Sequence, residues 1–125
     1  MMARPVRMPA KSKYHAAPTV VDGIRFDSKR EAQRYGELKL LAKAGEIHSL
    51  ERQVEFALCT LSRPQWEDTA RVSVRVVAKY VADFTYYDRH GHRHVEDVKG
   101  VRTAMYVLKK KWLELQDGIQ IREVR

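Results

Sequence analysis

Two acidic residues and one lysine stand inside apolar runs of this sequence, where charged side chains are uncommon. Asp83 and Asp97 each lie in such a run, and Lys99 follows two residues after Asp97. An ionised group in a central strand carries a desolvation cost of several kcal/mol unless it is paired or binds a metal. Since residues two apart share a face of a strand, we expect Asp97 and Lys99 to point together, with Glu96 on the opposite face.

If the strands on either side of an expected turn at 88–91 form a hairpin, Asp83 and Asp97 approach each other. Two converging carboxylates repel, which raises a pKa or recruits a cation, and oxygen ligands suit Mg²⁺ or Mn²⁺. Such a metal would polarise a phosphodiester and generate hydroxide, while Lys99 orients water or steadies developing charge. Glu31 is a candidate third carboxylate. The alternative is a structural one, a buried Asp–Lys ion pair beside a surface aspartate.

The elements that must position these residues begin after a basic segment. Residues 1–18 hold three of the four prolines and no apolar periodicity, which is typical of a flexible basic arm. We expect residues 19–125 to form a single domain. Asp22 and Gly23 lie between short apolar runs, and this pair favours a two-residue hairpin turn because glycine adopts positive φ without strain.

A first helix is predicted from Ser28 to Gly45. Ser28 and Glu31 fit a capping box, in which hydroxyl and carboxylate each bind an unpaired amide, and Gly45 is a natural helix stop. Glu31 also shares a helix face with Tyr35 and Leu38, which should face the core. The Glu31 carboxylate therefore has two open interpretations, as the partner of the cap or as an acid of the site.

Strands dominate the middle of the chain, and a second helix follows them. Expected strands cover 46–50, 53–61, 72–87, 92–99 and 119–124, with a loop over 62–70. Alternation puts Val54, Phe56 and Leu58 on one side of their strand. The second helix is expected to start after Thr103 and to stop at Gly118. Its apolar stripe, which should face the core, consists of Met105, Leu108, Trp112 and Leu115.

The positive charge of the chain is segregated. The 24 Lys and Arg against 16 Asp and Glu give a net charge of +8. Residues 1–20 hold four basic residues and no acid, residues 99–125 hold seven basic against three acidic residues, and the rest is balanced. Segregated positive charge favours a polyanionic partner, because neutralising phosphates releases condensed counterions. The alternative is a solubilising surface.

Several classes of protein are excluded by the composition. No run approaches the roughly 20 apolar residues of a membrane helix, so we expect no membrane association. No apolar segment follows Arg4 and Arg7, so the N-terminus does not resemble a secretory signal. Cys59 is the only cysteine, which excludes a disulfide framework and a multi-cysteine zinc site. We expect a reducing, cytoplasmic location, which is the bacterial host cell if the chain is phage-encoded.

The spacing of the charged residues resembles a known motif. Asp83, followed fourteen residues later by Asp97-Val98-Lys99, resembles the motif of the PD-(D/E)xK nuclease superfamily. The predicted order of helix, three strands, helix and strand is similar to the shared core of this superfamily. Gln53 is also part of the resemblance. The chain also resembles phage-encoded small nuclease-like proteins and archaeal-type Holliday-junction resolvases. Ala82 stands where the motif has proline, and Asp97 is one methylene shorter than the usual glutamate.

This resemblance implies a fold and a set of roles. The fold is a restriction-endonuclease-like α/β core, a mixed β-sheet flanked by helices, in residues 19–125. Glu31 corresponds to the first-helix carboxylate, Asp83 to the central metal-binding aspartate, Asp97 to the (D/E) position and Lys99 to the catalytic lysine. The carbonyl of Val98 is implied as a further metal ligand. The implied cofactor is Mg²⁺, with Mn²⁺ as a substitute and no organic cofactor.

The resulting hypothesis is a metal-dependent, structure-selective endodeoxyribonuclease. Its favoured substrate is the four-way DNA junction, which needs two active sites and hence a homodimer. The alternatives are a nicking, flap or end-processing phage nuclease, and a catalytically inactive DNA-binding module on the same fold. The predicted DNA contacts are a set of basic and amide side chains: Lys11, Lys13, Lys29, Arg30, Gln53, Arg102, Lys109, Lys110 and Lys111.

A histidine cluster is a candidate for a separate metal site. His90, His92 and His94 alternate around a predicted turn, and an H-x-H pair on a strand can bind a transition metal. Without a further ligand nearby in the sequence, we interpret the three histidines as the polar tip of a hairpin.

Overall fold

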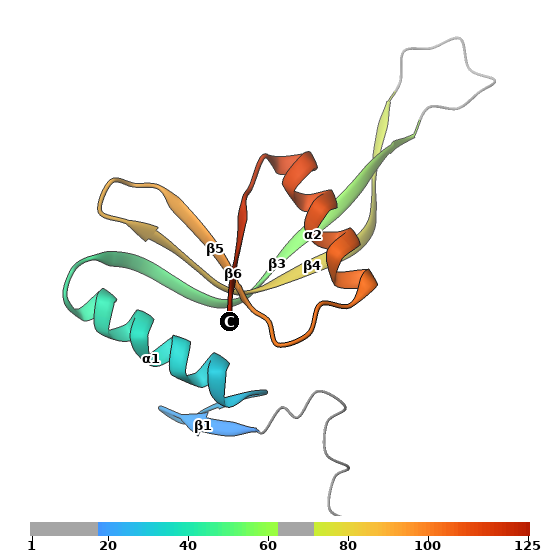
Figure 1. Ribbon diagram of the computed structural model, residues 1–125. Helices are drawn as coiled ribbons and strands as arrows, with labels where there is room; N and C mark the ends of the chain where they lie inside the picture. Colours follow the sequence, from blue (N-terminus) through green and yellow to red (C-terminus); the bar gives the residue numbers. More distant parts are fainter. Residues whose placement is uncertain (1–17, 63–71) are drawn as a thin grey trace, which may run out of the picture.

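A computed structural model describes residues 18–62 and 72–125 (Figure 1). The elements in chain order are β1 (Thr19–Val21), β2 (Ile24–Phe26), α1 (Lys29–Lys43), β3 (Ile47–Ser62), β4 (Ser73–Asp88), β5 (Arg93–Val98), α2 (Ala104–Asp117) and β6 (Ile121–Val124). Apart from two expected strands that form the single strand β3, the sequence predicted the order of the elements correctly. The basic arm, apart from its last residue, and most of the expected loop over 62–70 lie outside the described residues.

The main sheet has four strands in the order β3-β4-β5-β6. The first two pairings are antiparallel, and β5 pairs with β6 in parallel because α2 carries the chain back across the sheet. The fold is thus α/β, with a mixed sheet flanked by helices, as expected. None of the helices in the described part of the chain is long and apolar enough to cross a membrane.

A small hairpin precedes the first helix. Asp22 and Gly23 both have positive φ, of 53° and 73°, which is the backbone of a two-residue turn that matches the twist of its strands. The predicted hairpin of β1 and β2 is confirmed.

Both ends of α1 follow from local chemistry. The Ser28 hydroxyl accepts the Glu31 amide at 3.1 Å, so Ser28 is the N-cap. Gly45 has a φ of +77° and donates its amide to the Ala42 carbonyl, while Glu46 donates to Leu41, which satisfies the last carbonyls of the helix. The predicted start and stop are confirmed.

One expectation about the strands was wrong. The two short strands expected over 46–50 and 53–61 form a single strand, β3, paired along its length with β4. Ser49 and Gln53 adopt positive φ, and the register shifts between His48 and Glu51, so the irregularity is a bulge within one strand. Val54, Phe56 and Leu58 do lie on the more buried side, as alternation predicted.

The orientation of α2 also differs from the prediction. Thr103 caps the helix by accepting the Tyr106 amide, and Gly118 ends it in the left-handed conformation, both as expected. The expected core stripe, however, is largely in solvent: Met105, Leu108 and Leu115 are exposed, and Trp112 is half-buried. The fully buried residue of the helix is Leu113.

The physical reason is that α2 carries two apolar stripes. The sheet takes the smaller one, in which Leu113 is accompanied by the long side chains of Tyr106 and Lys110. The polar tips of Tyr106 and Lys110 reach Glu123 of β6, at 3.2 Å and 3.8 Å, while their apolar parts cover the sheet. Of the larger stripe, Met105, Leu108 and Leu115 face outward, while Trp112 packs against the core under α2.

Two apolar clusters hold the helices to the sheet. One lies under α1 and includes Phe26, Leu38 and Phe84, and the other lies under α2 and includes Leu113 and Val95. At β5 the two helices lie on opposite faces of the sheet. Val95 packs in the cluster under α2, whereas the next residue, Glu96, binds Arg34 of α1. β5 is therefore buried from both sides, and the candidate residues lie at its end.

Candidate active site

The β4–β5 pairing brings Asp83 beside Asp97. The ladder between the two strands ends at the pair Phe84–Glu96, and the residues that continue it are Asp83 and Asp97. Beyond that pair, the Asp83 carboxylate accepts the amide of Val98 at 2.8 Å. The Asp83 side chain thus takes the place of a backbone carbonyl as the acceptor for the Val98 amide. This hydrogen bond holds Asp83 against the end of β5.

Asp97 is the most unusual residue of the site. Its side chain is 1% exposed, and neither carboxylate oxygen has a hydrogen-bond partner within the described parts of the chain. Lys99 Nζ lies 3.6 Å from Oδ1. Burial raises the pKa of Asp97 to about 6, although the Lys99 charge opposes the rise. A buried carboxylate whose only close charge partner is one lysine, with no hydrogen bond of normal length, is a poor structural element and a suitable cation ligand.

Glu31 joins this pair through Gln53. The Gln53 amide Nε2 donates to Glu31 Oε1 at 3.3 Å and to Asp83 Oδ1 at 3.4 Å, so one side chain bridges two acids. Burial, and after it the Asp83 charge, raises the pKa of Glu31 to about 7. Burial also raises the pKa of Asp83, against the hydrogen bond from Val98. Of the two interpretations of Glu31, the carboxylate faces the site, and only its backbone amide takes part in the cap.

Lys99 is held on both sides. Its backbone amide donates to the Val124 carbonyl of β6 at 2.9 Å, and its Nζ lies 4.3 Å from the centroid of the Tyr106 ring. An ammonium over an aromatic face is attracted to it, so Tyr106 of α2 limits where the Lys99 side chain can go. Sequence reasoning missed this contact, because it depends on which face of α2 meets the sheet.

Glu96 is excluded from the site by its own partners. It points to the other face of β5, where the Arg34 guanidinium donates to both carboxylate oxygens at 2.8 Å and the Tyr86 hydroxyl donates as well. Although burial opposes ionisation, these bonds hold the pKa of Glu96 below its usual range. The expected alternation of Glu96 and Asp97 is confirmed. Arg34 was not identified from the sequence as the partner of Glu96. A buried acid requires a cation nearby, but the sequence does not show which helix supplies it.

The acids of the site offer the type of ligand that divalent cations bind, but they do not form a closed set of ligands. Within residues 18–62 and 72–125, no group of three or more His, Cys, Asp and Glu side chains lies close enough to hold a metal ion as the side chains stand. The acids are neighbours linked through Gln53 and the Val98 amide. They offer only oxygen donors, which suit a hard cation such as Mg²⁺, and both Asp97 oxygens lack a hydrogen bond among the described residues.

The predicted DNA-binding residues differ in how exposed their side chains are and in whether they already contact other residues. Lys11 and Lys13 lie outside the described residues. Lys29 and Lys111 are exposed, and Lys109 is half-buried. Gln53 faces the acids of the site.

The remaining three basic residues are engaged in contacts of their own. Arg30 donates to the Arg125 carbonyl at 2.8 Å, Arg102 pairs with Glu123 at 3.2 Å, and Lys110 pairs with Glu114 at 3.3 Å. The ion pairs of Arg102 and Lys110 cancel part of the positive field that the sequence suggested around α2.

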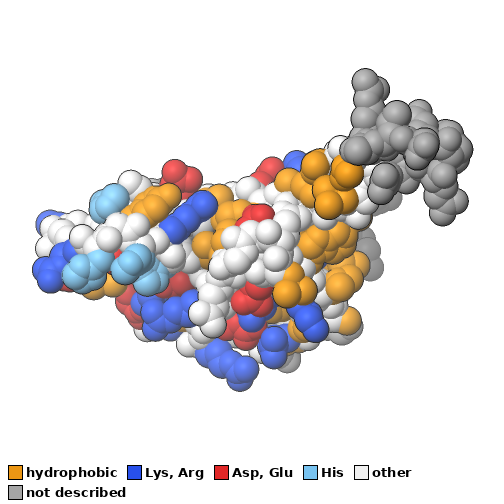
Figure 2. Space-filling model, turned by 90° about the horizontal axis from the view of Figure 1, so that it is seen from above, with side chains coloured by type: hydrophobic (Ala, Val, Ile, Leu, Met, Phe, Trp, Pro, Cys, Tyr) orange, Lys and Arg blue, Asp and Glu red, His pale blue; other side chains and the backbone are white. Residues whose placement is uncertain are grey.

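The histidines gather at the β4–β5 turn, at one end of the molecule (Figure 2). Asp88 accepts the amides of His90 and His92, and its Oδ2 lies 2.8 Å from Nε2 of His94. The bond with His94 lowers the pKa of Asp88. Asp88 thus organises the turn, in agreement with the interpretation of the histidines as a polar hairpin tip.

Comparisons with known proteins give one match. A family model described as "Protein of unknown function (DUF1064)" matches residues 11–125. No curated protein and no solved structure matches the chain. The function therefore has to be argued from the residues of the site.

Proposed function

The chain belongs to the DUF1064 family, and we propose that it is a metal-dependent, structure-selective endodeoxyribonuclease with a core of the PD-(D/E)xK type. One observation carries the proposal: Asp97 is buried, its oxygens have no hydrogen-bond partner among the described residues, and it lies beside Asp83 and Lys99. A carboxylate kept in this state destabilises the fold, which is typical of functional sites rather than of structural ion pairs.

The architecture supports the same interpretation. The observed order of helix, three strands, helix and strand agrees with the shared core that this superfamily has. The tripeptide Asp97-Val98-Lys99 ends β5 next to Asp83 of the neighbouring strand. These two features are independent, because the strand order does not require acidic residues at the ends of the strands.

The residues that would hold Mg²⁺ are Asp83 and Asp97, with Glu31 and the Val98 carbonyl as further ligands. When bound, the ion polarises the phosphodiester and lowers the pKa of the attacking water. Gln53 keeps the Glu31 and Asp83 carboxylates turned toward each other by donating to both.

Lys99 has a separate role that its surroundings support. Its ammonium is positioned by Asp97 and by the Tyr106 ring, within reach of a phosphate that would lie at the acids. There it would steady the negative charge that develops on the phosphate during hydrolysis, or orient the water. The backbone bond to Val124 limits how far Lys99 can shift.

The favoured substrate is branched DNA, with the four-way junction first. The net charge of +8, gathered toward both ends of the sequence, suits a polyanion such as DNA. Cutting a two-fold symmetric junction in both strands requires two sites, and hence a homodimer. Such an enzyme would meet its substrate in the cytoplasm of a bacterial cell.

The decisive experiment is a cleavage assay with several DNA forms. Labelled four-way junction, flap, plain duplex and single strand are incubated with the protein in Mg²⁺ or EDTA. The wild type should place paired nicks at the junction in Mg²⁺ and none in EDTA, Asp83→Asn should be inactive, and Lys99→Ala should cut at least about 100-fold more slowly. Asp117→Asn and Lys43→Ala, which change exposed residues of the same types, are the matched controls and should cut normally.

Each other outcome selects another function. Cutting confined to flaps or ends would assign an end-processing nuclease, and equal cutting of plain duplex would remove the structure selectivity. Junction binding without cutting in Mg²⁺ or Mn²⁺ would assign the non-catalytic DNA-binding module.

A further inference from the structure

The outward stripe of α2 has the spacing of a helix-packing seam. Met105, Leu108, Trp112 and Leu115 follow one another at intervals of three, four and three residues, which is the spacing that two packed helices share. At about 100° per residue, Leu108 and Leu115 lie on the side of α2 away from Leu113, which faces the sheet, whereas Met105 and Trp112 lie at the flank between the two sides. The seam is therefore covered only at Trp112, which packs against the core under α2, while Met105, Leu108 and Leu115 are exposed.

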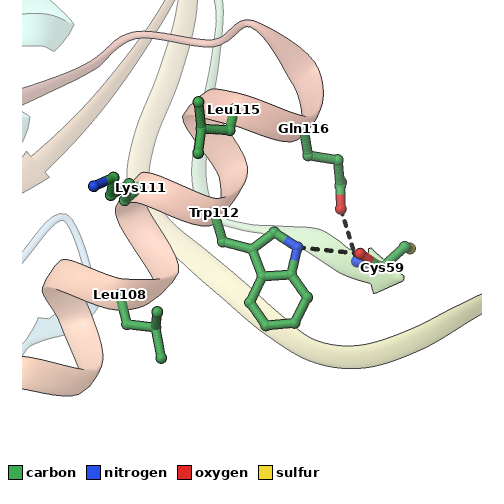
Figure 3. Close-up of a pocket in the computed structure, with 6 residues that line it drawn as sticks. All are labelled: Cys59, Leu108, Lys111, Trp112, Leu115 and Gln116. Carbon is green, nitrogen blue, oxygen red and sulfur yellow. Dashed lines mark hydrogen bonds between the residues drawn. The ribbon is translucent and has the colours of Figure 1, made fainter. Parts of the chain in front are cut away.

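A groove runs along this seam (Figure 3). It has a volume of about 470 Å³ and is lined by Cys59, Leu108, Lys111, Trp112, Leu115 and Gln116. The Trp112 indole donates to the Cys59 carbonyl at 3.1 Å, and Gln116 accepts the Cys59 amide at 2.7 Å. These bonds attach α2 to the edge of β3 and fix the indole, so the groove has a rigid wall.

Beside α2, the outer ends of β3 and β4 form a ribbon with further exposed apolar residues. Leu61 and Val74 are cross-strand partners there, and Val76 is the partner of Cys59. Leu61, Val74 and Val76 are all exposed. Figure 2 shows hydrophobic side chains gathered at this end of the molecule. We call the α2 seam together with these three ribbon residues the apolar face.

The area of the apolar face is close to what a dimer needs. Its exposed members, apart from half-buried Trp112, are between 56% and 77% exposed, which equals about four fully exposed side chains. At roughly 100 Å² for each fully exposed Leu or Val, they offer about 400 Å². One copy in a standard interface buries about 800 Å², of which about 65% is apolar in homodimers, or roughly 500 Å². The face supplies most of this area.

We propose that the apolar face binds a second copy of this chain. A seam that is symmetric in its spacing can pack against itself about a two-fold axis, with Leu108 of one copy against Trp112 of the other. Lys111 lies at the rim, where its aliphatic part covers apolar area while its ammonium reaches water. The biological reason for a dimer rests on the proposed function, because cutting a junction needs two active sites. The association itself is measured without DNA, so it can be tested separately.

The test is sedimentation velocity of the full chain across micromolar concentrations. The wild type should sediment as a dimer, and Leu108→Asp/Leu115→Asp as a monomer. The matched control is Leu40→Asp, which places the same charge at an exposed leucine of α1 and should remain dimeric. A second variant, Leu108→Gln/Leu115→Gln, adds no charge and should raise the dissociation constant more than about tenfold. Circular dichroism verifies that each variant is folded.

The outcomes separate this surface from the proposed chemistry. A wild type that stays monomeric would overturn the inference, and so would a double variant that remains dimeric or a Leu40→Asp control that dissociates. Nicking of supercoiled DNA in Mg²⁺ is measured on the same samples. A dimer that depends on the seam but never nicks DNA supports the dimer interface and contradicts the proposed function. A wild type that is monomeric but nicks DNA contradicts the dimer interface and supports the proposed function.

Discussion

Asp97→Asn removes the buried negative charge of the site at almost constant side-chain volume. We expect this variant to be inactive and, without metal, to be more stable than the wild type. The wild type must fold around a carboxylate that has lost water and has no hydrogen bond of normal length among the described residues, and the charge of Lys99 at 3.6 Å and the nearby Asp83 backbone only partly compensate. An amide at the same position carries no charge to desolvate.

The magnitude follows from the pKa of Asp97. Folding raises it from 3.8 to about 6, so the wild type loses stability as the pH rises from 3.8 to about 6, and the loss is complete above that. The loss amounts to about 3 kcal/mol at pH 8 and about 1 kcal/mol at pH 4.5. The amide keeps unpaired polar atoms, whose cost of about 1–2 kcal/mol is the same at both pH values. The advantage of the Asp97→Asn variant should therefore shrink by about 2 kcal/mol between pH 8 and pH 4.5.

Urea denaturation in EDTA at the two pH values measures this difference. Asp117→Asn, at an exposed position of α2, is the matched control and should change stability by no more than a few tenths of a kcal/mol at either pH. Added Mg²⁺ should stabilise the wild type and leave the Asp97→Asn variant unchanged, which narrows the gap at pH 8. A difference between the wild type and this variant that is the same at both pH values would refute the electrostatic reasoning about Asp97.

Three further substitutions test other parts of the structure. Lys99→Ala should slow single-turnover cleavage by about 10²–10³-fold with little change in DNA affinity measured by anisotropy, and an equal loss of binding would contradict its role at the reacting phosphate. In Gln53→Asn, the asparagine tolerates the same positive φ, but its side chain is too short to bridge two acids. Cleavage by this variant should fall about tenfold, while its free energy of unfolding in urea should stay within about 0.5 kcal/mol of the wild type. A larger loss of stability would mean that the role of Gln53 is structural. Leu113→Ala should reduce the free energy of unfolding by about 3 kcal/mol against almost nothing for exposed Leu40→Ala, and similar effects would mean that α2 faces the other way.

Much of the site could be predicted because strand geometry acts at short range. Alternation alone separates Asp97 and Lys99 from Glu96, and the structure confirms that separation. The caps at Ser28 and Thr103 were also predictable, since each depends on a side chain and an amide three residues apart.

What could not be predicted depends on contacts between elements. The periodicity of α2 reveals two apolar stripes, and only the sheet decides which one it covers, through Leu113 and the reach of Lys110 to Glu123. The larger stripe is the natural first choice, because burial energy scales with apolar area, and here that choice was wrong. Arg34 opposite Glu96 is another such contact, made across 62 residues of sequence.

The two aspartates differ in a way that matters for reading relatives of this chain. Asp83 holds the end of β5 through the Val98 amide, so a descendant that no longer cut DNA would still gain from keeping it. Asp97 accepts no hydrogen bond from the described residues and weakens the fold where it stands. Once cleavage no longer mattered, drift would replace Asp97 first. The proposed function therefore predicts that relatives without cleavage activity lose the aspartate at position 97 before the one at position 83.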